Sequence, residues 1–113
     1  MNNSIGVIKI SDDVITVIAG IAASEIKGVY PLFGVNGNNS LNKRVISKGI
    51  KVTVSDNKTN IDINVAVDYG VKIPYAIKEL QENVKNQIEA FTGVKIQEIN
   101  VFVQKIMSKE FTQ

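Results

Sequence analysis

Residues 61–93 constrain the fold of this chain more than any other stretch. In the first part, every second side chain is large and apolar, and the side chains between are polar or small. This period of two is typical of a strand with one buried face and one exposed face. The residues expected on the buried face are Ile61, Ile63, Val65, Val67 and Tyr69.

The second part of this stretch has the pattern of an amphipathic helix. Gly70 interrupts the strand, and Pro74 suits a first helical turn because its missing N–H would have no partner there. Apolar residues then recur at intervals of three and four, which places them on one side of a helix. They are Ile77, Leu80, Val84, Ile88 and Phe91. Gly93 follows them, and glycine adopts a left-handed C-terminal cap at the lowest cost.

The N-terminal part predicts another strand and another helix. Residues 5–10, IGVIKI, have the composition of a short strand. Ser11 is a good N-cap because its hydroxyl can accept a hydrogen bond from an amide of the next turn, and Gly28 marks the expected end of the helix. Residues 29–33 predict an edge strand or half a strand, since Pro31 removes one ladder donor.

The middle of the chain predicts a loop followed by a hairpin. Residues 34–49 are rich in glycine, asparagine and serine, which favour turns over regular ladders. Long loops of this kind are often functional or mobile. Residues 50–55 alternate and predict a half-exposed strand. A five-residue polar turn over residues 56–60 should return the chain antiparallel into the strand that begins at Ile61.

Residues 94–106 predict the last strand, with an irregularity near its start. Ile96 and Ile99 have opposite parity, so both can face the core only if a one-residue bulge lies at residues 97–98. Two separate short strands are the alternative. In either case Phe102 points away from the main core face. It is either a contact residue for a partner or covered by the loop or the C-terminal tail.

These elements predict one domain over residues 1–113, with a core at about 5–106, the loop 34–49 and a frayed tail 107–113. The predicted order is β-α-β-β-β-α-β. The fold class is α+β with two layers, in which two helices pack on one face of a mixed, mainly antiparallel sheet. The connection from strand 61–69 through the second helix to the last strand is a crossover, which predicts parallel pairing.

The composition excludes most catalytic and metal-binding chemistry. The 113 residues include neither histidine nor cysteine, so the commonest general base, the commonest metal ligand and any thiolate are missing. Asp62 and Asp68 share a strand face but lie about 20 Å apart by strand rise, which is too far for an acid/base pair. We therefore expect no enzyme, no catalytic or cofactor-binding residue, no cofactor and no metal site.

One charge feature could serve a partner. Residues 43–58 hold five basic residues and a single acidic one. A solvated loop and hairpin rim is the simplest interpretation, and a contact surface for an acidic partner, anionic lipid or nucleic acid is the alternative. The predicted interaction patch consists of Lys43, Arg44, Lys48, Lys51 and Phe102. A nucleic-acid-binding module using residues 43–58 is the alternative function, although a net charge of +2 gives it little support.

Short segments along nearly the whole chain form an ordered series. They are IGVIKIS at 5–11, VI at 14–15, AGIA at 19–22, GV at 28–29, KGIKV at 48–52, VDYGVKI at 67–73, VK at 84–85, TGV at 92–94 and INVFV at 99–103. This series resembles the alkaline shock protein family, a bacterial family associated with envelope stress. The chain is similar to the short type that lacks long charged extensions.

The resemblance implies a small, non-enzymatic protein of Gram-positive-type bacteria that self-associates and serves envelope stress or homeostasis through protein–protein contacts. It implies a homo-oligomer in the cytoplasm, held at the periphery of the inner membrane by a membrane-anchored partner. The family has no catalytic residues to transfer to this chain. No apolar run approaches the roughly 20 residues of a membrane-spanning helix, so we expect no direct membrane insertion.

Overall fold

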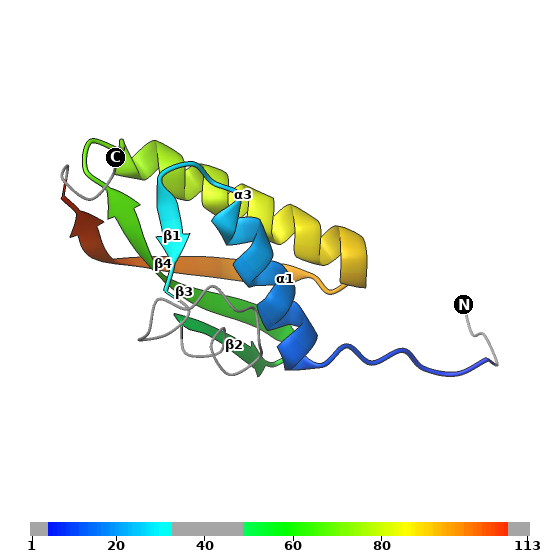
Figure 1. The fold of residues 1–113 in the computed structure, drawn as a ribbon. Coiled ribbons are helices and arrows are strands. Elements are labelled where there is room, and N and C mark those ends of the chain that lie inside the picture. Colours follow the sequence, from blue (N-terminus) through cyan, green and yellow to red (C-terminus); the bar gives the residue numbers. More distant parts are fainter. Residues whose placement is uncertain (1–4, 33–48, 109–113) are drawn as a thin grey trace.

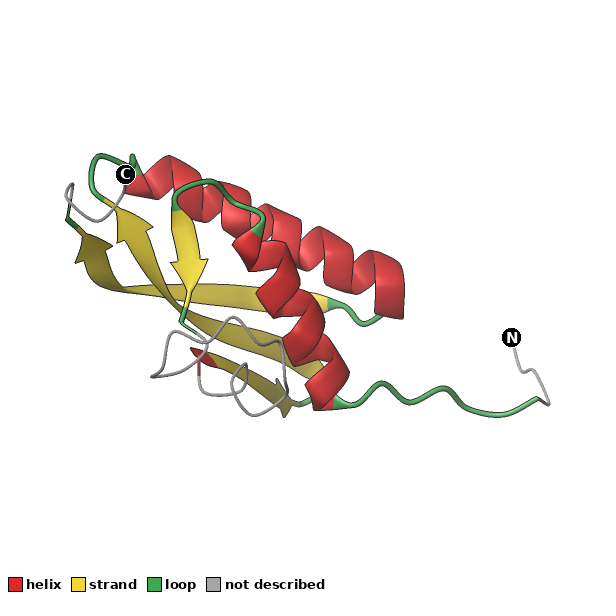
Figure 2. Cartoon of the chain, viewed as in Figure 1, coloured by secondary structure: helices red, strands yellow, loops and turns green. Residues whose placement is uncertain are grey.

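The computed structural model describes residues 5–32 and 49–108 of the chain. In this part, two helices lie on one face of a four-stranded sheet (Figures 1 and 2). The elements in chain order are α1 (Asp12–Ser24), β1 (Val29–Pro31), β2 (Ile50–Ser55), β3 (Lys58–Asp68), α3 (Ile73–Thr92) and β4 (Ile96–Met107). This arrangement confirms the predicted two-layer α+β class.

Strand β3 is the centre of the sheet. Along one edge it pairs antiparallel with β2 over its first half and with β1 over its second half. Along the other edge it pairs in parallel with β4. The sheet is therefore mixed, and the crossover through α3 joins parallel strands as predicted. The short β1 interrupted by proline is an edge strand, again as predicted.

Helix α1 begins at its predicted cap. The Ser11 hydroxyl accepts a hydrogen bond from the Val14 amide at 3.3 Å. Asp12 and Asp13 place negative charge at the positive end of the helix dipole. The buried residues of α1 are small or β-branched, which lets the helix lie close to its neighbours. They are Ile15, Thr16, Ala19, Gly20, Ala22 and Ala23.

Helix α3 also follows the sequence pattern, except at its end. Pro74 lies in the first turn, and Gly93 caps the helix with a left-handed φ of 77°. The buried stripe is inaccessible to solvent at Leu80, Val84 and Ile88. Phe91, predicted on the same stripe, is instead 71% exposed. It belongs to the last turn of the helix, beyond Ile88, the last buried residue of the stripe.

The core lies between β3 and the two helices. The four inward-facing aliphatic side chains of β3 are at most 1% exposed, as the alternation predicts, and each contributes about 1.5–3 kcal/mol by burial. They are Ile61, Ile63, Val65 and Val67. Tyr69 does not continue this face and is 67% exposed. The strand ends at Asp68, and the chain turns at Gly70 with a φ of 94°, so the prediction for Tyr69 was wrong.

Residues 5–10 form no strand, so the predicted first element of the order is wrong. Val7 and Ile8 are 82% and 87% exposed, and the segment runs away from the body of the molecule (Figure 1). Other strands pair with both edges of β3. This segment therefore cannot pair with the central strand, whatever its own apolar pattern. Ile10, next to α1, is the residue of this segment that packs against the core.

The hairpin turn is shorter than predicted. Asp56 and Asn57 alone connect β2 to β3, instead of five residues. Both have positive φ angles, 52° and 63°, which is the geometry of a type I′ turn. Short polar side chains such as these tolerate the left-handed region. The predicted loop lies almost wholly outside the described residues, and of the predicted tail Met107 still belongs to β4.

Candidate interaction surface

Strand β4 lies at an edge of the sheet. Its 12 residues pair with β3 on one side, and no other strand of residues 5–32 and 49–108 pairs with its second side. An edge strand presents backbone N–H and C=O groups that a further strand can use. Strands usually have about 5–6 residues, so β4 is long. Its outer edge is the main candidate for a contact surface.

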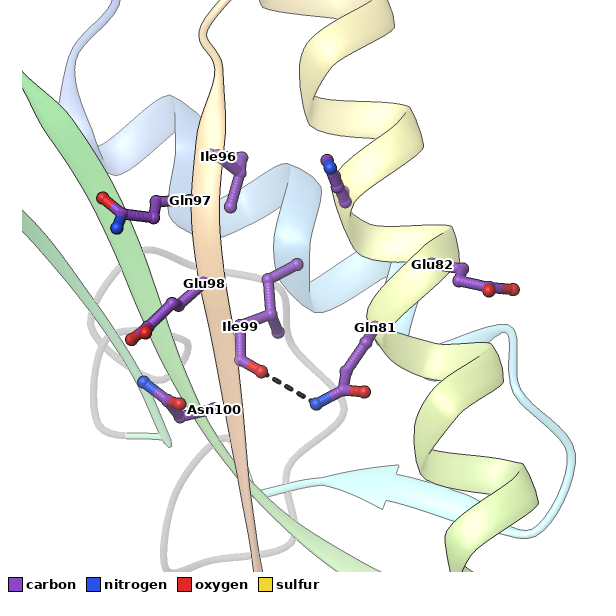
Figure 3. A pocket seen from close by; sticks show the side chains of 8 residues that line it. Gln81, Glu82, Ile96, Gln97, Glu98, Ile99 and Asn100 are labelled. Carbon is purple, nitrogen blue, oxygen red and sulfur yellow. Dashed lines mark hydrogen bonds between the residues drawn. The ribbon is translucent and has the colours of Figure 1, made fainter.

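Two bulges divide β4. The pairing with β3 passes over Gln97 and later over Gln104. The first confirms the irregularity predicted between Ile96 and Ile99. Figure 3 shows its effect, because Gln97 and Glu98 lie together on one side of the strand while Ile96 and Ile99 point towards α3. The second bulge was not predicted.

Three hydrogen bonds show which backbone groups of β4 face the outer edge. The Ile96 amide donates to the Glu89 carboxylate at 3.0 Å, and the Ile99 carbonyl accepts from the Gln81 side chain at 2.9 Å (Figure 3). Both partners belong to α3, so these groups point away from β3. The Met107 carbonyl instead accepts from the amide that follows β3 at 3.0 Å. Residues of β4 that face the core therefore direct their backbone groups to the outer edge.

Apolar side chains dominate β4 from residue 99 onward. They are Ile99, Val101, Phe102, Val103, Ile106 and Met107. Phe102 is 47% exposed and Ile106 is 56% exposed. The charged residues of the strand are Glu98 and Lys105, and both are exposed. Such a strand offers apolar contact area together with one charge of each sign.

A shallow cleft of about 330 Å³ lies between α3 and the start of β4 (Figure 3). Gln81, Glu82 and Lys85 line it from the helix, and residues 96–100 line it from the strand. The Gln81 and Glu89 side chains of α3 thus form hydrogen bonds with the outer edge of β4, at Ile99 and at Ile96. Both of these bonds lie before residue 100 of β4.

The sheet face opposite the helices is polar, and its side chains bond one another across strands. The bonds join Asn100 to Asp62 at 3.0 Å, Gln104 to Asn64 at 2.7 Å and Tyr30 to Asp68 at 2.9 Å. In the last pair the Tyr30 hydroxyl donates to the carboxylate, which raises the pKa of Tyr30 above its ordinary value of 10.0. These partners hold neighbouring strands together, and none of the bonds arranges a group for catalysis.

A second polar network joins the two helices. Asn83 of α3 donates to the Ala22 carbonyl of α1 at 2.8 Å and to the Glu25 carboxylate at 3.0 Å. Gln87 donates to the same carboxylate at 2.6 Å. The two amide donors stabilise the charged form, so the pKa of Glu25 lies below its ordinary value of 4.5. This network explains the helix pairing and points to no ligand.

The predicted patch is only partly visible. Three of its residues lie outside the described part of the chain: Lys43, Arg44 and Lys48. Lys51 is exposed on β2, opposite Asp62 of β3. Phe102 is opposite Asn64 on the same outer face, away from the core as its position in the strand predicted. Lys51 and Phe102 therefore lie on the same face of the sheet, on the two strands that flank β3.

Metal and membrane chemistry find no support in residues 5–32 and 49–108. This part of the chain holds no group of three or more histidine, cysteine, aspartate or glutamate residues that could bind a metal ion. Neither described helix is long and apolar enough to cross a membrane.

Comparison with known proteins identifies the family. The profile of the alkaline shock protein 23 family, described as having a cell envelope-related function, matches residues 1–108. This chain belongs to the alkaline shock protein family. The resemblance stated from the sequence is thereby confirmed, and the description of the family names no catalytic activity.

The relatives include proteins of similar length and longer ones. The chain is 36% identical over 102 residues to the uncharacterized protein YqhY of Bacillus subtilis, covering 88% of this chain and 76% of that protein. It is 35% identical over 111 residues to the uncharacterized protein Spy1614 of Streptococcus pyogenes, covering 94% and 92%. A stress response regulator gls24 homolog of Streptococcus pyogenes is 26% identical over 112 residues, which cover 93% of this chain and 61% of that protein. No solved structure matches the chain.

Proposed function

We propose that this chain is a non-catalytic member of the family that acts in its cell envelope-related function through protein–protein contacts, including contacts with further copies of itself. The observation that carries the proposal is the outer edge of β4. A 12-residue strand with one described neighbour, apolar side chains and two charges is able to pair with another strand.

The chemistry of the described residues favours a contact protein over an enzyme. The chain has no histidine and no cysteine, and the carboxylates of Glu25, Asp62 and Asp68 bond neighbouring amides or a tyrosine hydroxyl. The cleft beside β4 is shallow and holds Glu82, Lys85 and Glu98 at exposed positions. An active site needs titratable groups that converge in a concave pocket, and this cleft lacks such a constellation.

We also propose that the protein works in the cytoplasm beside the membrane, held there by a membrane-anchored partner. The cell envelope-related description of the family supports a place near the envelope. The stress response regulator name of a relative supports a role in a stress response. No observation on the described residues favours the nucleic-acid-binding alternative.

The oligomeric state in solution tests this proposal. We expect dimers or larger assemblies by sedimentation velocity and light scattering at about 100 µM, a concentration at which even a contact of about 1 µM is saturated. A purely monomeric protein at this concentration would contradict self-association. Purification of a tagged copy from its own cells, with and without membranes, tests the membrane-anchored partner separately.

A further inference from the structure

The backbone of β4 is arranged so that the strand can pair with a second copy of itself. Two antiparallel strands related by a two-fold axis exchange both hydrogen bonds at the residue on the axis, if its backbone groups face the partner. Val101 follows Ile99 by two residues, and the Ile99 carbonyl points away from β3. The N–H and C=O of Val101 therefore also face the outer edge.

An axis at Val101 also matches the faces of the two strands. Ile99 then lies opposite Val103 of the second copy, and both side chains face the helix layer. Asn100 lies opposite Phe102 of the second copy, and both face the polar side of the sheet. An axis midway between two residues would place residues of opposite faces across from each other, which the pleat of a strand does not permit. An axis at Asn100 or Phe102 would keep the faces but change every opposite pair.

The second bulge then brings the two charges of β4 together. A bulge sets two residues of one strand opposite one residue of the other, so Gln104 and Lys105 lie opposite Glu98 of the second copy. Residues 98 and 105 direct their backbone groups to their own β3, so they form the closer kind of cross-strand pair. The two-fold axis repeats the pair, giving two contacts between opposite charges. A shift of the axis by one residue or more would lose both.

We propose that β4 is a strand-pairing interface for a second copy of this chain, with a two-fold axis at Val101 that joins two four-stranded sheets into one. The inference rests on the self-association proposed above and specifies its surface. The occupant is a second copy because one strand provides matched backbone groups, matched faces and complementary charges for its own two-fold repeat.

Charge reversal tests the register. Glu98→Lys and Lys105→Glu each set like charges opposite one another at both symmetric positions. Because both side chains are exposed, neither change should alter the fold. Each single variant should self-associate at least tenfold more weakly by sedimentation. The double variant Glu98→Lys/Lys105→Glu should return to within about threefold of the original protein, since the pairs are restored with their signs exchanged.

Mixing the two single variants gives the sharpest result. Each pairs poorly with itself, but Glu98→Lys against Lys105→Glu places opposite charges together at both positions, so we expect a mixed dimer. Lys51→Glu, on the strand at the opposite edge, is the matched control and should not change association. Circular dichroism of all variants checks that the fold is kept.

The outcomes separate this inference from the proposed function. If the unaltered protein is monomeric at about 100 µM, a concentration well above an ordinary micromolar contact, self-association fails and this interface fails with it. If it is oligomeric but insensitive to both charge reversals, only the β4 interface is overturned. Weakening by Lys51→Glu alone would overturn it as well, in favour of the patch that includes Lys51.

Discussion

Replacing Gln81 with alanine should have opposite effects on the folded monomer and on the dimer. Within one copy, the Gln81 side chain donates to the Ile99 carbonyl at 2.9 Å. A neutral hydrogen bond contributes a net 0.5–1.5 kcal/mol or so, and the monomer should lose about that much stability. In the dimer, the amide of Val103 from the second copy needs the same carbonyl, so Gln81 competes with strand pairing.

The gain for the dimer follows from its symmetry. Two Gln81 side chains compete in each dimer, so Gln81→Ala should favour association by about 1–3 kcal/mol, twice the value of one hydrogen bond. This corresponds to a dissociation constant lowered roughly 5- to 150-fold. The Gln81→Ala protein should therefore unfold more easily and associate more tightly.

Two measurements separate these effects. Urea unfolding at low protein concentration gives the free energy of unfolding of the monomer, and sedimentation equilibrium gives the dissociation constant. Gln97→Ala is the matched control, because Gln97 lines the same cleft but points away from α3 (Figure 3). Unchanged or weaker association of Gln81→Ala would refute the competition between Gln81 and a second β4.

Two further predictions concern stability. Glu25 has a lowered pKa because Asn83 and Gln87 donate to its carboxylate, so its contribution is fully present above its ordinary value of 4.5 and is lost as the pH falls through the folded value. The stability difference between the original protein and Glu25→Gln, measured by urea unfolding, should therefore shrink between pH 7 and pH 3; a difference that does not change would contradict this. Leu80→Ala should cost about 2–5 kcal/mol, whereas Phe91→Ala, at an exposed position of the same helix, should change the free energy of unfolding by less than about 0.5 kcal/mol. Equal costs in thermal or urea unfolding would show that the stripe of α3 is not the core.

The sequence predicts the centre of this fold well because a regular apolar pattern marks the buried face of each of its two main elements. The alternation of β3 and the stripe of α3 both correspond to buried faces. Tyr69 and Phe91 continue these patterns but are exposed. Periodicity gives the direction of a side chain, and only the tertiary structure shows where the covering layer ends.

The same limit explains residues 5–10. Their composition suits a strand, but a strand also needs a neighbour to pair with, and this segment forms no ladder with any described strand. Which strand remains at the outside depends on contacts between residues far apart in the sequence. A single sequence does not determine that order.

The candidate interface was predictable only in part. The first bulge of β4 followed from the opposite parity of Ile96 and Ile99, because both are aliphatic. The second, at Gln104, has the same signal, since Val103 and Ile106 also have opposite parity, but the prediction did not use it. Gln81 and Glu89 resemble ordinary surface residues of an amphipathic helix, and their contacts with the strand edge become visible only in the folded chain.

Disulfide cross-linking at the proposed axis tests the central claim most directly. The chain has no cysteine, so Val101→Cys introduces a single thiol. Across a two-fold antiparallel pair the two Cα atoms lie about 5.5 Å apart, within the range of a disulfide. Mild oxidation should link Val101→Cys into covalent dimers. The control Val54→Cys, exposed on β2, should stay largely monomeric. Absence of cross-linking at residue 101, or equal cross-linking at residue 54, would contradict pairing through β4.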